Sequence, residues 1–141
     1  MQKNYLTDGP IAHHVIVSLL NKMSEISDSG GHSFFLGQVR ADIKEGKIVR
    51  AIEYSAYESM VHDEADNIIR SVLKESDDIK SIDILHSTGI VKTGEISLLV
   101  AVSAGHRKQA MEACSKTVEM IKERLPVWKK EIYDDNTHTW K

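Results

Sequence analysis

The sequence predicts an α+β fold, with helices packed on a largely antiparallel sheet in the order α-β-β-α-β-β-α-β-β. Three segments repeat apolar residues at helical spacing, and pairs of strand-like stretches lie between and after them. Polar or glycine-containing turns separate the two members of each pair, which is typical of hairpins. The length of 141 residues and the composition, 41% hydrophobic and 28% charged, indicate one globular domain over residues 1–141.

The first predicted helix follows Gly9-Pro10, because proline suits the first turn of a helix. Its apolar residues recur at helical spacing, at Ile11, Val15, Leu19 and Met23. The polar stretch 27–31 ends this helix, and strands are predicted at 32–40 and 48–57. The charged, glycine-containing segment 40–48 between these strands is expected to be a mobile loop.

The second predicted helix covers residues 58–75. Its expected buried stripe is Met60, Ala65, Ile68, Ile69 and Val72. Strands at 79–87 and 95–104 follow, with a turn at Thr93-Gly94. The strand 95–104 is almost continuously apolar in its middle, so we expect it to be central and covered on both faces.

The third predicted helix runs from Gly105 to Arg124 and is ended by Pro126. One apolar stripe follows steps of three and four, through Met111, Cys114, Val118, Ile121 and Leu125. Cys114 is therefore expected to be a core residue. The stretches VWKKEIY and THTW look like two short closing strands around a polar turn at 134–136.

Several classes of protein are disfavoured by the composition. One cysteine excludes an internal disulfide and a cysteine-based zinc site, and the seven histidines show no metal-binding spacing. We therefore expect no metal site. The N-terminus lacks the pattern of a secretory signal, and no apolar run is long enough to span a membrane. A soluble, cytoplasmic protein is expected.

Positive charge is concentrated in one part of this acidic protein. The net charge is −3, yet residues 105–130 contain seven Lys or Arg and three Glu, which gives +4 there and −7 elsewhere. This distribution argues against general nucleic-acid binding and favours a localised anionic ligand. A solvated helix face with Glu/Lys spacing would explain the same residues.

Five cationic or titratable side chains are candidates for an anion site. His106 and Arg107 open the third helix, where free backbone N–H groups attract anions, although an ordinary strand-to-helix turn would look the same. Lys122 lies in the last turn of that helix, where a cation is favoured in any case. If the tryptophan before Lys129 is buried, strand alternation turns this lysine outward or into a cleft. Arg40 ends a strand and is either a ligand group or a surface residue.

The pieces together resemble the catalytic (large) subunit of molybdopterin synthase. The resemblance covers about residues 32–140. The matching stretches are GQVR (37–40), IEYSAYESM (52–60), HSTG…TGEISLLVAVSAGHR (86–107), AMEAC (110–114), IKERLPVWKKE (121–131) and Trp140. The chain differs from the family pattern at Ser87, where an arginine is frequent, and at Met111, where an aromatic residue is usual. It ends at Lys141, so any late basic contact beyond Trp140 is either missing or is Lys141 itself.

The resemblance implies an α/β hammerhead-like fold and a sulfurtransferase. Members of the family form a homodimer, and each end binds a small ubiquitin-like sulfur carrier. The carrier's C-terminal Gly-Gly thiocarboxylate enters the large subunit and donates sulfur to cyclic pyranopterin monophosphate. Two transfers give the dithiolene of molybdopterin, with no metal or cofactor in this step.

The resemblance also implies which residues act. The matching positions are Phe35, Arg40, His106, Arg107, Lys122 and Lys129. Phe35 would line the pocket, while Arg40, His106 and Arg107 would hold the substrate phosphate. Lys122 and Lys129 would neutralise the thiocarboxylate, polarise the carbon under attack and move protons.

The length of the third helix limits how these residues can meet. Arg107 and Lys122 are fifteen positions apart, which corresponds to about 22 Å along a helix. Either only one of them takes part, or a second protomer supplies His106 and Arg107. The implied homodimer favours the composite site, in which WKKE forms the pocket floor of one protomer and GHR of the other completes it.

Two other functions compete with this hypothesis. A non-catalytic module that docks a ubiquitin-like partner would not need Arg40, Lys122 and Lys129 together. A nucleotide or RNA binder would want exposed aromatic residues on one sheet face. The chain is only 6% aromatic, and the adjacent Phe34 and Phe35 are expected to point to opposite faces.

Overall fold

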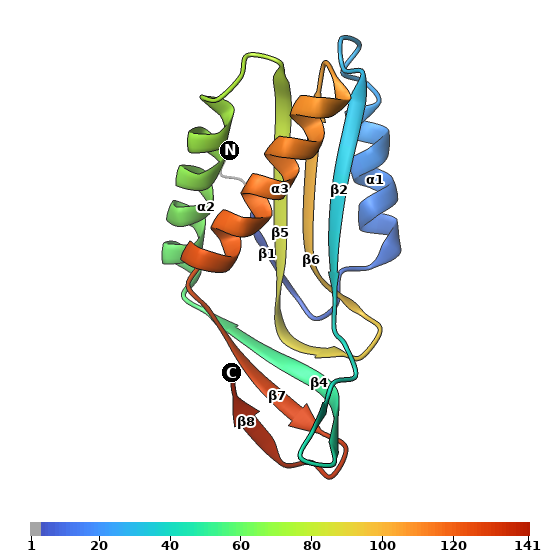
Figure 1. The fold of residues 1–141 in the computed structure, drawn as a ribbon, viewed down its shortest axis with the longest axis vertical. Helices are drawn as coiled ribbons and strands as arrows, with labels where there is room; N and C mark the ends of the chain where they lie inside the picture. Colours follow the sequence, from blue (N-terminus) through green and yellow to red (C-terminus); the bar gives the residue numbers. More distant parts are fainter. Residues whose placement is uncertain (1–3) are drawn as a thin grey trace.

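The computed structural model describes residues 4–141 and confirms the α+β prediction (Figure 1). The helices are α1 (His13–Met23), α2 (Glu58–Leu73) and α3 (Arg107–Arg124). The strands are β1 (Leu6–Asp8), β2 (Gly31–Gln38), β3 (Ile43–Lys44), β4 (Lys47–Ala56), β5 (Ile79–Lys92), β6 (Ile96–Ala104), β7 (Val127–Tyr133) and β8 (His138–Trp140). The first three residues of the predicted domain 1–141 lie outside the described part.

The strands pair in the order β2-β6-β5-β4-β7-β8, and these neighbours are antiparallel. Strand β5 is longer than predicted because it changes partners along its length. Its first part pairs with β6 as far as His86, and its end pairs with β4 from Gly89 onward. The sheet therefore has a broad part carrying the helices and a narrower arm of β4, β7 and β8 (Figure 1).

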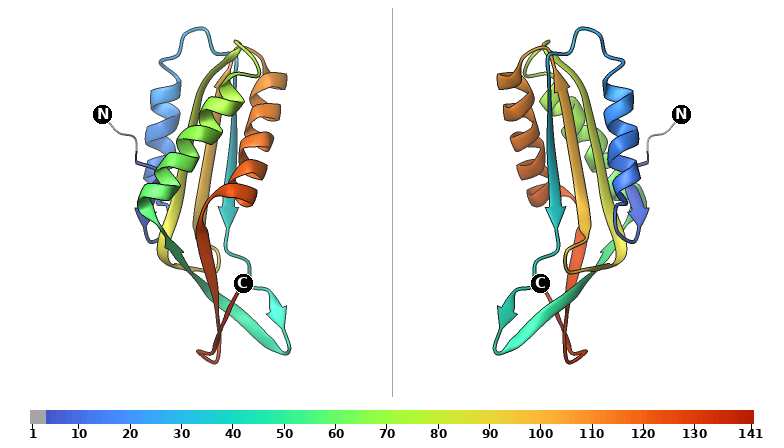
Figure 2. Two further views of the ribbon diagram at one scale, coloured as in Figure 1. Left: turned by 90° about the vertical axis from the view of Figure 1, so that its left-hand side faces the viewer. Right: turned by 90° about the vertical axis from the view of Figure 1, so that its right-hand side faces the viewer.

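Helices cover both faces of the broad part of the sheet. Figure 2 shows α2 and α3 on one face and α1 on the other. Every residue of β6 is buried, which confirms that this strand is central and covered on both sides. Phe34 packs with the cluster around α1, whereas Phe35 packs with the larger cluster beneath α2 and α3. The two phenylalanines therefore face opposite sides of the sheet, as predicted.

Several details differ from the sequence prediction. The short strands β1 and β3 were not predicted, because two or three residues give no periodic pattern. Strand β3 lies in the predicted loop 40–48 and forms a hairpin with β4 through a turn in which Glu45 and Gly46 have positive φ. Met60 and Met111 were wrongly predicted to be buried; both are exposed, because each helix faces the sheet with a slightly different stripe.

The residues just before α3 pack tightly against the end of the loop that joins α1 to β2, and Gly30 makes this close contact possible. A Cβ atom at Gly30 would clash with the backbone carbonyl oxygen of Gly105, which cannot move like a flexible side chain. We expect Gly30→Ala to lower the free energy of unfolding by about 2 kcal/mol. At Gly31 the nearest atom to an added Cβ is 3.2 Å away. Urea denaturation should therefore show a clearly smaller loss of unfolding free energy for Gly31→Ala than for Gly30→Ala. Equal losses in the two variants would contradict this explanation.

Candidate active site

A hollow of about 290 Å³ lies where the broad sheet meets the arm of β4, β7 and β8. The end of β2, the start of β6, the middle of β4, the C-terminal turn of α3 and strand β7 all contribute to its walls. Four of the predicted site residues line this hollow: Phe35, Arg40, Lys122 and Lys129. Residues separated by up to 94 positions in the sequence thus meet in one small pocket.

His106 and Arg107 do not reach this pocket. They stand at the N-terminal end of α3, whereas Lys122 is in its last turn. Fifteen residues separate Arg107 from Lys122, or about 22 Å of helix. The prediction that a single protomer cannot bring both groups to one small ligand therefore agrees with the helix as observed.

The arrangement of β7 turns one lysine into the pocket and its neighbours away. Lys129 pairs with Tyr54 of β4 and is partly buried, while Trp128 is exposed and rests edge-on against Tyr57. The alternation was predicted correctly, but the expected burial of Trp128 was wrong. The pocket wall, rather than a buried tryptophan, determines where Lys129 points.

Burial and neighbouring charges act together on Lys129. Burial lowers the pKa of Lys129, and the charges of Lys122 and Lys141 lower this pKa further, while the Glu131 carboxylate raises it. A lysine with a lowered pKa carries a larger neutral fraction near neutral pH, so it is better able to accept and return a proton. This is the electrostatic setting that proton transfer at a lysine requires.

Glu131 is a charged residue of the pocket that the sequence prediction missed. Its side chain is only 3% exposed, and Lys44 Nζ lies 2.6 Å from its Oε1 atom. Lys141 Nζ is 3.9 Å from Oε2, so the last residue of the chain does supply a basic group to the pocket. The signal was present: in a strand, residues 129 and 131 share one face.

A neutral histidine lies behind the pocket wall. Tyr54 donates a hydrogen bond to Ser97 Oγ at 3.0 Å, and its ring packs edge-on against His86 at 5.1 Å between centroids. His86 donates from Nδ1 to the carbonyl of Ser87 at 2.7 Å. Burial lowers the pKa of His86 to about 4, against the effect of the Ser87 bond, and Lys129 and Lys122 add to the lowering. The positive charge of the pocket therefore comes from its lysines and Arg40.

Arg40 stands at the mouth of the pocket. Its side chain is 82% exposed, and its Nε atom is 3.0 Å from Asp42 Oδ1. The neighbouring hairpin is tied to the arm by Lys44 on Glu131 and by Lys47, whose Nζ is 3.1 Å from Asp135. The guanidinium is exposed at the edge of a pocket that three lysines also line. It is therefore well placed to bind a phosphate or carboxylate that arrives from solvent.

Two charged neighbours act on the pKa of Lys129 in opposite directions, and each effect can be tested by one substitution. Glu131→Gln removes the charge that raises the pKa of Lys129, so this pKa should fall further. Lys141→Met removes a charge that lowers it, so the pKa should rise. NMR titration of ¹³C-methylated lysine checks both changes. Shifts in the same direction for the two variants would contradict the charge arrangement described here.

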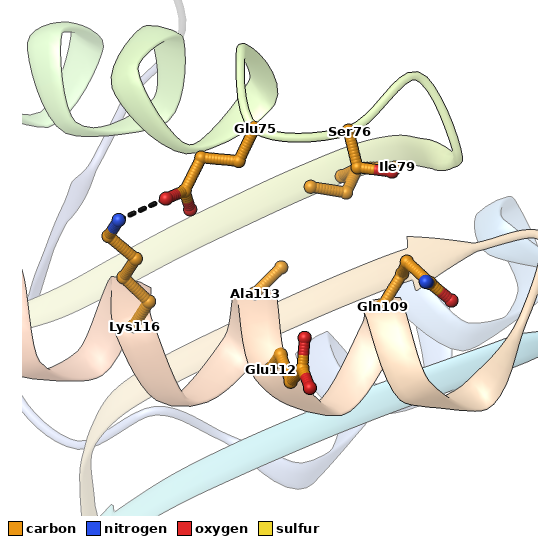
Figure 3. Close-up of a pocket in the computed structure, with 7 residues that line it drawn as sticks. All are labelled: Glu75, Ser76, Ile79, Gln109, Glu112, Ala113 and Lys116. Carbon is orange, nitrogen blue, oxygen red and sulfur yellow. Dashed lines mark hydrogen bonds and ion pairs between the residues drawn. The ribbon is translucent and has the colours of Figure 1, made fainter.

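A second hollow, of about 450 Å³, lies between the end of α2 and the first half of α3 (Figure 3). Glu75 and Lys116 form an ion pair across it, and Glu112 adds a further carboxylate. With two acidic groups and one basic group, this hollow has no excess of positive charge. It is larger than the lysine pocket, but its chemistry does not favour an anionic ligand.

The described residues offer neither a cluster of metal ligands nor a helix that could span a membrane. Within residues 4–141, no three His, Cys, Asp or Glu side chains lie close enough to hold a metal ion together. Among the helices of the same described part, none combines the length and apolar character needed to cross a membrane. Cys114 is buried, as predicted.

Comparison with known protein sequences points to one family. The family described as MoaE protein matches residues 6–124. A molybdopterin synthase catalytic subunit from Dictyostelium discoideum is 41% identical over 122 residues, covering 85% of this chain and 77% of that protein. A protein of the same name from Drosophila willistoni is 42% identical over 113 residues, or 79% of this chain, but this chain spans only 30% of its length.

Solved structures with a similar fold include a molybdopterin synthase and a complex of molybdopterin-converting factor subunits. A crystal structure of molybdopterin synthase from Staphylococcus aureus has a TM-score of 0.85 and 29% identity, covering 100% of this chain and 98% of that one. A complex of subunits 1 and 2 of molybdopterin-converting factor from Helicobacter pylori gives a TM-score of 0.79, covering 96% and 87%; at 20% identity it shows a shared fold alone. The extent of the family match and the 41% identity to a curated relative show that this chain belongs to the MoaE protein family.

Proposed function

We propose that the chain is the catalytic subunit of a molybdopterin synthase. It transfers sulfur from the C-terminal thiocarboxylate of a small ubiquitin-like subunit to cyclic pyranopterin monophosphate, and two transfers give the dithiolene of molybdopterin. The observation that carries this proposal is the convergence of Lys122, Lys129 and Arg40 with Phe35 on one small pocket. Both reactants are anionic, and a pocket lined by cations favours them over neutral molecules.

The lysines have distinct tasks in this proposal. The thiocarboxylate tail enters beside Lys122 and Lys129, whose ammonium groups offset its negative charge. As the thiocarboxylate sulfur bonds to a side-chain carbon of the pterin, the bond from that carbon to an oxygen breaks, and Lys129 gives the departing oxygen a proton, for which its lowered pKa suits it. Water then attacks the acyl carbon of the tail and breaks its bond to sulfur, so the sulfur stays on the pterin and the carrier leaves as an ordinary carboxylate. Phe35 packs beside this path, and Arg40 meets the phosphate at the mouth.

A second protomer completes the site in this proposal. His106 and Arg107 stand at the far end of α3 from the lysines, so they are offered to a neighbouring pocket rather than to their own. A two-fold symmetric homodimer makes two such composite sites at once, because each protomer gives its helix start and receives its partner's. The proposal takes residues 1–141 as one functional domain and places the enzyme in the cytoplasm.

Reconstitution tests this function. The purified protein is mixed with a thiocarboxylated small subunit and cyclic pyranopterin monophosphate, and the dithiolene product is measured after oxidation to its fluorescent derivative. Product that depends on all three components supports the proposal. Absence of product, although the small subunit binds, would leave a non-catalytic module that docks a ubiquitin-like partner. A small subunit that ends in an ordinary carboxylate is the matched negative control.

A further inference from the structure

The start of α3 carries a carboxylate–imidazole pair that the proposed reaction has not yet used. Asp78, in the turn before β5, accepts a hydrogen bond from the backbone N–H of His106 through Oδ2, at 2.9 Å. Its other oxygen, Oδ1, is 3.1 Å from the Nδ1 atom of the same histidine. Both oxygens of one carboxylate are thus committed to a single residue at the proposed interface.

Asp78 is itself held firmly. Its backbone carbonyl accepts from the Gly105 N–H at 2.9 Å, and its own N–H donates to Ser76 Oγ at 3.1 Å. The carboxylate lies so close to Gly105 that a Cβ atom there would clash with Oδ1. Backbone and side-chain contacts therefore place the two oxygens in one position relative to the helix start.

This arrangement decides which way the imidazole presents itself. A carboxylate oxygen can only accept, so Nδ1 of His106 must be the donor in the 3.1 Å contact. Nε2 is then the ring nitrogen that remains for a ligand, and in the protonated ring it is a second donor that can bind a phosphate oxygen. The His106 side chain is 80% exposed, so the ring projects outward while its near edge is tied down. A ring fixed in this way loses less rotamer entropy when it binds a ligand than a freely rotating one.

We propose that Asp78 is a positioning residue that fixes the ring of His106, so that Nε2–H of its protonated form points into the partner protomer's pocket and donates to the phosphate of the substrate. This inference rests on the proposed composite site. The carboxylate also accepts one backbone N–H at the start of α3, that of His106. The proposal therefore assigns the contact with the substrate phosphate to the side chains of His106 and Arg107.

A capping role alone is the competing explanation. A carboxylate that accepts a backbone N–H at a helix start stabilises the helix whether or not it orients a histidine. Asp78→Asn separates the two roles. Its one oxygen can still accept from the backbone N–H, and asparagine is a good cap, but its amide nitrogen cannot accept from Nδ1–H. Asp77 offers a matched control, because it is an exposed acid one residue away.

The test is a double-mutant cycle measured in the reconstituted reaction. Asp78→Asn should raise the KM for cyclic pyranopterin monophosphate about fivefold with little change in kcat, because it weakens a binding group. In a His106→Ala background the same change should have no further effect, since the group it orients is gone. Asp77→Asn should leave KM unchanged. Nitrogen NMR of His106 in the neutral ring should show Nδ1 protonated in the wild type and this preference lost in Asp78→Asn.

The outcomes separate this inference from the proposed function. A wild-type KM in Asp78→Asn, or a KM effect that persists without His106, would overturn the positioning role while leaving the synthase proposal intact. A lowered melting temperature with an unchanged KM would show that Asp78 only caps the helix. No product from the wild type would overturn the proposed function itself, whatever the NMR spectra show.

Discussion

Lys129→Ala is expected to slow sulfur transfer by at least about 100-fold, because a positioned proton donor or acceptor contributes that much or more to a rate. Lys129 is the lysine that burial and two neighbouring cations hold at a lowered pKa, inside the pocket that Lys122 and Arg40 also line. Its loss removes both a positive charge and a proton-transfer group. Single-turnover measurement with preformed thiocarboxylate isolates the chemical step from carrier exchange.

The next residue along the chain is the matched control. Lys130 points to the opposite face of β7, where its Nζ lies 3.0 Å from Glu53 and 5.4 Å from the centre of the Trp140 ring. Lys130→Ala should therefore change the rate by less than about twofold, since Lys130 does not line the pocket. Equal losses for the two variants would mean that general basicity, rather than the pocket, supports the reaction.

Glu131→Gln is expected to lower the free energy of unfolding by about 2 kcal/mol. The carboxylate is buried and is the negative partner of Lys44, with Lys141 nearby. Its neutral replacement leaves several lysines around the pocket without a counter-charge. Removing one member of a fully buried pair costs about 3 to 5 kcal/mol, but Lys44 is partly exposed and can turn to water, so the loss should be smaller.

An exposed ion pair between α3 and the segment after α2 provides the comparison. Glu75 and Lys116 are both about half exposed, so Glu75→Gln should cost less than about 1 kcal/mol. Chemical denaturation of both variants measures the difference. If Glu131→Gln is as stable as Glu75→Gln, then Glu131 does not act as the buried counter-charge of the lysine pocket.

Most of the fold could be predicted from local patterns. The continuous apolar run of β6 indicated a central strand, and the apolar steps of α3 indicated a helix against it. Local patterns failed where tertiary pairing decides the structure. Strand β1 exists because it pairs with the corner of β5, and β5 extends to Lys92 because it gains β4 as a second partner. Neither pairing leaves a periodic signal in its own segment.

The candidate site divides in the same way. The number of residues between Arg107 and Lys122 was enough to predict that they lie far apart, because the rise per residue of a helix is nearly constant. The resemblance, rather than any spacing, indicated that Arg40 would join the lysines. Glu131 and Asp78 were missed because each works through a contact made by folding: one with Lys44 on a distant hairpin, the other with the residue before α3.

The central claim is that one catalytic centre is assembled from two protomers, and mixed dimers test it most directly. Lys129→Ala and His106→Ala protomers are co-expressed with different tags, and dimers carrying both tags are isolated. One of the two sites then contains an intact lysine pocket and an intact His106. At a substrate concentration well below the wild-type KM, about half of the wild-type rate should therefore return, although each variant dimer alone is much slower under the same conditions.

The control pairs Lys129→Ala with Lys122→Ala. Both residues belong to the same pocket, so every site in this mixed dimer lacks one lysine and no activity should return. Recovery in the first mixed dimer and none in the control is the predicted result. Failure of the Lys129→Ala and His106→Ala dimer to recover activity, with both protomers folded and paired, would contradict the composite site.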